Sequence, residues 1–89
     1  MSYINTYTFK AEIGKTALMG FIATVPPELF CFVISKTGDN YGHFIGDDVI
    51  EYFTNEFPVK SLEIVPFEKL KELERRGCLV WGNKEILAG

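Results

Sequence analysis

The chain has 89 residues and a net charge of −3, with 47% hydrophobic, 15% aromatic and 24% charged residues. This composition excludes a disordered chain, and the length leaves apolar material for one core, so we predict a single domain over residues 1–89. No apolar run approaches the roughly 18 residues of a membrane span, and the N-terminus lacks the apolar stretch of a secretory signal. We therefore expect a cytoplasmic protein with no membrane partner.

Strand patterns dominate the first half of the chain. Residues 7–13 alternate apolar and polar side chains, as a half-buried strand does, and Gly14-Lys15 offers a two-residue turn into a second strand over residues 17–24. Residues 29–34 are continuously apolar, which is typical of a strand covered on both faces. A short additional strand over residues 41–45 is compatible with the pattern.

Helical spacing appears in the second half. Residues 49–57 carry apolar side chains on one helical face, and Asp48 and Glu51 have the spacing of a capping box. After a short alternating stretch that includes Leu62 and Ile64, a second helix is predicted over residues 66–77, with a proline in its first turn and a glycine at its C-terminal end.

A terminal hairpin is predicted around Gly82-Asn83, with one arm over residues 78–81 and the other over residues 84–88. The order becomes β-β-β-(β)-α-β-α-β-β. We expect an α+β fold with a mainly antiparallel sheet of five or six strands and both helices on one face. The positions that share the apolar phases of these elements form the predicted core: Phe9, Ile13, Phe21, Phe30, Phe32, Ile34, Phe53, Leu62, Leu70 and Trp81.

Charge is unevenly distributed along the chain. Residues 37–59 contain five acidic residues and no Lys or Arg, whereas the remainder holds all nine basic residues and seven acidic ones, a net of +2. Such asymmetry steers partners or aligns subunits, although a solvated acidic helix face has the same composition. Because an open sheet of this size also leaves edges, we predict a homo-oligomer.

The two cysteines, Cys31 and Cys78, both lie in apolar runs, where reduced thiols pack as small hydrophobic side chains. We expect both to be free. A thiolate–imidazole pair with His43, the one histidine of the chain, is the enzymatic alternative. His43 with Asp39, Asp47 or Asp48 fits no specific metal-ligand spacing, so neither a metal nor a cofactor is predicted.

The second predicted helix carries basic residues, namely Lys69, Lys71, Arg75 and Arg76. Three glutamates share the helix, and Glu72 stands four residues before Arg76, the spacing of an intrahelical ion pair. The pattern therefore favours a solvated amphipathic helix over a nucleic-acid-binding face. Nucleic acid is not an expected partner.

The segment over residues 38–46 has the most unusual local composition, with three glycines, two aromatic residues and the histidine. We interpret it as a loop that presents a binding site, with Asp39, Asn40, Tyr41 and His43 as the contact residues. The competing interpretation is a turn that leads into the next helix.

No motif in the chain assigns a reaction. The preferred hypothesis is a small non-catalytic binding module, an inhibitor or adaptor, that contacts a protein or sequesters a small polar ligand. One alternative is a small enzyme with a His43-centred loop. The other is a nucleic-acid binder that uses the helix over residues 66–77.

Overall fold

The computed structural model describes residues 4–88. Its strands and helices are β1 (Thr6–Glu12), α1 (Lys15–Thr24), β2 (Phe30–Ile34), β3 (Asn40–Ile45), α2 (Asp47–Glu56), β4 (Ser61–Ile64), α3 (Phe67–Arg75) and β5 (Leu79–Gly82), with short 3₁₀ turns η1 (Pro27–Leu29) and η2 (Lys84–Ala88). Over this range the strands form one sheet in the order β4-β1-β3-β2-β5, and every neighbouring pair is antiparallel. The predicted α+β class with an antiparallel sheet is confirmed.

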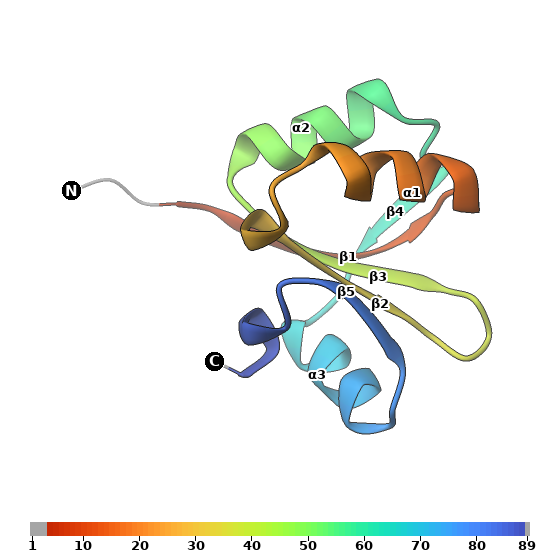
Figure 1. The fold of residues 1–89 in the computed structure, drawn as a ribbon, viewed down its shortest axis with the longest axis vertical. Helices are drawn as coiled ribbons and strands as arrows, with labels where there is room; N and C mark the ends of the chain where they lie inside the picture. Colours follow the sequence, from red (N-terminus) through yellow and green to blue (C-terminus); the bar gives the residue numbers. More distant parts are fainter. Residues whose placement is uncertain (1–3, 89) are drawn as a thin grey trace.

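The helices occupy both faces of the sheet (Figure 1). Two of them, α1 and α2, cover one face, which we call the α1 face, and α3 with η2 covers the other, which we call the α3 face. The prediction of two helices on a single face was therefore wrong: the pair α1 and α2 shares a face, and α3 lies opposite. Within residues 4–88 no helix is both long and apolar enough to cross a bilayer.

The segment over residues 17–24 belongs to helix α1, so the hairpin predicted at Gly14-Lys15 is wrong. Ala17, Leu18 and Met19 are strong helix formers, whereas the strand interpretation gave weight to the aromatic and β-branched residues after them. Leu18 and Phe21, three residues apart, are buried on the same side of the helix. Helix α1 thus replaces a strand, and β1 pairs with β3 and β4 instead.

The C-terminal hairpin is also absent from the described residues. The chain turns at Gly82 and Asn83 as predicted, but residues 84–88 form the 3₁₀ turn η2. The Asn83 side-chain oxygen accepts a hydrogen bond from the Glu85 N–H at 3.0 Å, and its carbonyl accepts one from the Ile86 N–H at 3.2 Å. Asn83 therefore winds the chain into a turn that packs Leu87 against the α3 face.

The predicted helices begin and end close to the expected residues. Helix α3 follows Pro66, and Gly77 takes a φ of +85° just beyond its end. The capping box at Asp48 and Glu51 does not form, because α2 is capped at Gly46 without a side-chain bond. Asp47, in the first turn of α2, instead accepts hydrogen bonds from the Tyr7 hydroxyl and the Asn5 amide.

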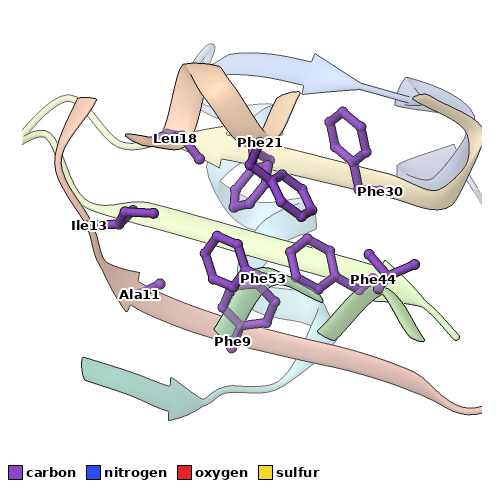
Figure 2. Close-up of a cluster of buried hydrophobic side chains, with 10 residues drawn as sticks. Phe9, Ala11, Ile13, Leu18, Phe21, Phe30, Phe44 and Phe53 are labelled. Carbon is purple, nitrogen blue, oxygen red and sulfur yellow. The ribbon is translucent and has the colours of Figure 1, made fainter. Parts of the chain in front are cut away.

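Phenylalanine rings fill the core of the α1 face (Figure 2). Phe21 of α1 and Phe53 of α2 meet at a centroid distance of 5.0 Å, and both contact Phe32 and Phe44 from the sheet below. Gly42 lies beneath them, where a Cβ atom would come within 2.6 Å of the Phe9 ring. The rings pack this closely because β3 has no side chain at that position.

The α3 face has a smaller core of its own. Cys31 and Val33 of β2 and Tyr41 of β3 pack against Leu70 and Leu73 of α3. Of the predicted core, Phe9, Ile13, Phe21, Phe30, Phe32, Phe53 and Leu70 are buried, whereas Ile34, Leu62 and Trp81 are only partly buried. Both cysteines are free; Cys31 is buried and Cys78 is partly buried.

Phe32→Ala is expected to lower the free energy of unfolding by about 3–5 kcal/mol, since it removes a fully buried ring from the centre of the aromatic core. Ile64→Ala, at a side chain that is 68% exposed, should change it by less than about 0.5 kcal/mol. Urea melts of the two variants measure both quantities. Equal effects would contradict the assignment of Phe32 to the core.

Candidate functional site

The segment over residues 38–46 is mostly a strand, so it does not form the predicted loop, whereas the additional short strand considered over residues 41–45 is confirmed. Asn40–Ile45 is β3, and it is hydrogen-bonded on both sides, to β1 and to β2. Asp39 lies in the turn before it. Since side chains alternate along a strand, Asn40 points to the α1 face, while Tyr41 and His43 point to the α3 face. The four predicted contact residues are therefore divided between two faces of the sheet.

His43 is packed into the α3 face and is 9% exposed. Its Nδ1 lies 2.7 Å from the Thr8 hydroxyl on β1, and its ring lies against Phe67 of α3 at a centroid distance of 4.7 Å. Burial lowers the pKa of His43 below its ordinary value of 6.5. The imidazole is thus neutral at pH 7 and bridges two strands and a helix.

Cys31 stands directly opposite His43 in the β2–β3 register, on the same face of the sheet. The structure therefore places the cysteine and the histidine of the predicted thiolate–imidazole alternative at neighbouring positions. Burial, with a smaller contribution from Glu74, raises the pKa of Cys31 to about 11. Because the thiolate is the nucleophilic form, this thiol is unreactive at neutral pH.

The acidic residues named with His43 lie apart from it. Asp47 is bonded to Tyr7 and Asn5, and these hydrogen bonds hold the pKa of its carboxyl below the usual value, the Tyr7 bond contributing most. Asp39 accepts a hydrogen bond from Thr37 at 3.1 Å and lies 3.9 Å from the Lys10 ammonium. Among residues 4–88 no three His, Cys, Asp or Glu side chains converge in a way that would hold a metal ion.

A polar groove runs beside α3 on the α3 face. It has a volume of about 400 Å³ and lies between β1, β4 and the helix, with Lys10, Tyr41, Glu63 and Lys69 among its lining residues. A smaller hollow of about 240 Å³ adjoins it through Lys10 and Glu63 and reaches Asp39 and Asn40. Two ammonium groups here have partners within the chain, since Lys10 lies 3.9 Å from the Asp39 carboxylate and Lys69 lies 6.0 Å from the centroid of the Tyr41 ring.

An apolar groove of about 390 Å³ lies on the α1 face, between α1 and the β5 side of the sheet. Its apolar lining comes from Ile13, Leu18, Met19, Ile34, Leu79 and Trp81. Two polar side chains, Lys15 and Asn40, also line it. A largely apolar hollow with a few polar groups is the usual form of a specific binding site.

The groove adjoins the free edge of the sheet at β5. Leu79, on this edge, is 58% exposed although it is a large apolar side chain. The Asn83 N–H donates to the Phe30 carbonyl at 2.9 Å, so Asn83, Trp81 and Leu79 direct their backbone polar groups toward β2. Val80 and Gly82 therefore direct theirs outward from the sheet.

The other edge, β4, has a different character. Ile64 is exposed there, but Glu63 lies on the strand, Lys60 precedes it and Pro66 follows it. Charges and prolines of this kind discourage pairing with another chain. The residues of β5, Leu79–Gly82, include neither a charge nor a proline. Of the two edges, β5 is the one open to association.

Of the two polar side chains that line the apolar groove, the sequence predicted only Asn40 as a contact residue. Trp81, which also lines this groove, was predicted to lie in the core. Lys15 and Met19 were assigned to a turn and a strand, so their position beside β5 was not visible. The helix-forming run Ala17-Leu18-Met19 was the signal that would have placed them. Comparisons with protein-family models, curated proteins and solved structures found no match.

Burial of His43 predicts a pH-dependent stability. Because the folded-state pKa is lowered, the unfolded chain takes up the proton first as the pH falls, so the free energy of unfolding decreases from about pH 6.5 down to the lowered pKa and then levels off. Urea melts between pH 7.5 and 5 should show this decrease in the wild type. In His43→Gln the free energy of unfolding should stay constant over this pH range. If it decreases equally in the variant and the wild type, His43 is not the source of the pH dependence.

The two thiols should differ in reactivity. With Ellman's reagent at pH 8, we expect one fast equivalent from the partly buried Cys78 in the folded protein and a second, from Cys31, only in guanidinium chloride. Cys78→Ser should remove the fast equivalent and Cys31→Ala the slow one. Two fast equivalents in the folded wild type would show that Cys31 is accessible.

Proposed function

We propose that this chain is a non-catalytic protein-interaction module that binds an extended segment of a partner protein along the β5 edge. The observation that carries the proposal is the position of β5, an uncharged strand that pairs only with β2 among the described residues and lies next to an apolar groove. In strand addition, the main chain supplies hydrogen bonds and alternate side chains of the guest enter pockets beside the edge. Both requirements meet at β5.

The backbone supports this mode of binding. Val80 presents its N–H and C=O groups outward, as pairing with an incoming strand requires, and Gly82, where a φ of +88° begins the turn, directs its N–H outward as well. Leu79 and Trp81 point to the α1 face, where they line the groove. A guest residue on that face would therefore bury its side chain against Leu79, Trp81 and Met19.

The groove also suggests what the guest segment carries. Its apolar lining fits a branched or aromatic side chain, and Lys15 supplies a positive charge at one side. No acidic residue lines it within the described part of the chain. We expect preferred segments to carry apolar residues at alternate positions.

The alternatives have less support. The basic residues of α3 are partly neutralised on their own helix, since Arg76 lies 2.8 Å from Glu72 and Lys71 lies 4.0 Å from Glu68. A nucleic-acid-binding face would leave such charges to phosphates. The His43-centred enzyme would need an ionised Cys31 or a mobile imidazole, whereas Cys31 is protonated and His43 is held by Thr8 and Phe67.

A random-peptide library displayed on phage tests the proposal. Peptides selected on the wild-type protein should have apolar residues at alternate positions, and their binding should change the fluorescence of Trp81, the single tryptophan. Leu79→Asp should weaken the selected peptides at least tenfold, because it places a charge beside the groove. Ile64→Asp, the matched change on the other edge strand, should alter affinity less than twofold.

Two results would contradict the proposal. One is selection of peptides that bind equally to wild type and Leu79→Asp, which would place the interaction elsewhere, for example in the groove beside Lys69. The other is failure to select any peptide that binds the folded protein.

A further inference from the structure

We infer that the segment bound at the β5 edge is β5 of a second copy, in an antiparallel two-fold pairing centred on Val80. This inference rests on the proposed function and names its partner. It follows from the hydrogen-bonding phase of β5, from the side chains on each face, and from the contrast between the two sheet edges.

The hydrogen-bonding phase restricts the register. In an antiparallel pair, residues whose polar groups point outward must face one another, so Val80 and Gly82 have to pair with outward-pointing residues of the second strand. A two-fold axis at Val80 pairs it with the partner's Val80 and places Gly82 opposite the partner's Cys78. Each Val80 N–H then donates to the partner's Val80 carbonyl.

The ends of the strand fit the same register. The Cys78 N–H already donates to the Leu73 carbonyl at 3.1 Å, so Cys78 offers its carbonyl alone. Gly82 is placed to donate to that carbonyl in the partner. The two copies thereby form four backbone hydrogen bonds, two at Val80 and one at each end of the pairing.

Side chains match across this seam. On the α1 face Leu79 lies opposite the partner's Trp81, and the contact occurs twice by symmetry; on the α3 face the two Val80 side chains meet. Moving the axis to Trp81 would pair the two Trp81 side chains but would leave each Leu79 opposite the partner's Asn83, so both Leu79 contacts with an aromatic ring would be lost. Cross-strand pairs of apolar and aromatic side chains are a main source of sheet stability.

Charge permits the approach of two copies at this edge. Each chain carries a net −3, yet Leu79–Gly82 has no charged residue. The acidic helix α2 packs above β3 and β1, where Phe53 contacts Phe44 and Phe9, and does not overlie β5. The seam is therefore neutral, and the acidic surfaces lie away from it.

The β4 edge makes the assembly finite. With Glu63, Lys60 and Pro66 protecting β4, a dimer joined through β5 presents only protected edges, and growth stops at two copies. A four-residue strand pair buries less than the roughly 1,600 Å² of a standard interface. We therefore expect a weak, reversible dimer.

Sedimentation velocity between 5 and 500 µM tests the inference. Wild type should change from monomer to dimer over this range, and Ile64→Asp should do the same. Leu79→Asp should raise the dissociation constant at least tenfold. Val80→Pro, which removes the outward N–H while its neighbours keep their bonds to β2, should have the same effect. Circular dichroism melts of each variant confirm that it is folded.

A mixed sample of labelled and unlabelled protein tests the register by NMR. Intermolecular NOEs are expected between the Leu79 methyl groups and the Trp81 ring. A dimer that survives both β5 variants, or one that shows NOEs from Ile64 instead, would overturn the inference. A protein that is monomeric at 500 µM but binds the selected peptides at β5 would overturn the dimer alone, whereas loss of both would also refute the proposed function.

Discussion

Gly42 sits where two aromatic rings, Phe9 and Phe32, approach the middle of the sheet, and the arrangement of the α1 face depends on it. A Cβ atom there would lie 2.6 Å from Phe9 and 2.9 Å from Phe32. Without that atom, Phe9 and Phe32 come together across β3 at a centroid distance of 6.2 Å. Phe21 of α1 and Phe53 of α2 pack on these rings from the helix side, and this packing sets the positions of α1 and α2. The bare position in β3 is thus what allows two helices to share one face.

The second layer follows from the same strand. While β3 turns Gly42 and Phe44 toward the aromatic core, it turns Tyr41 and His43 to the opposite face, where α3 covers them. One short helix cannot cover the whole of that face, so the β1 and β4 side remains open as a polar groove. On the α1 face the two helices leave Trp81 and Leu79 uncovered at the other edge. Both grooves are consequences of covering five strands with three short helices.

Much of this arrangement could be predicted from sequence because local patterns and tertiary packing agree. The period of two in β1, the apolar run in β2 and the proline and glycine that bound α3 all specified their elements. The chain over residues 15–24 was different, because its aromatic and β-branched residues satisfy a strand as well as a helix. The packing of Phe21 against Phe44 and Phe53 adds to the local helix preference of Ala17-Leu18-Met19, and that packing joins residues far apart in the chain.

The candidate site could be predicted less well, for a related reason. Glycines and polar residues near positions 38–46 suggested a loop, but Gly42 is there to make room for rings and His43 to bridge two strands. A composition that is typical of an exposed loop therefore belongs here to a buried strand. The β5 surface had no such marker, since Leu79 and Trp81 resemble core residues until the sheet order puts them at an edge.

β2 and β5 pair in the sheet although they lie far apart in the chain, and this separation has a consequence for biosynthesis. β2 pairs with β3 on one side and with β5 on the other, and β5 leaves the ribosome well after β2 and β3. Until it arrives, the Phe30–Ile34 strand, which is almost entirely buried in the finished fold, has an open apolar edge. A nascent chain or a fragment truncated before Leu79 therefore exposes an uncharged, apolar strand with an open edge, which favours aggregation. β5 thus acts as an intramolecular cover for a strand made much earlier.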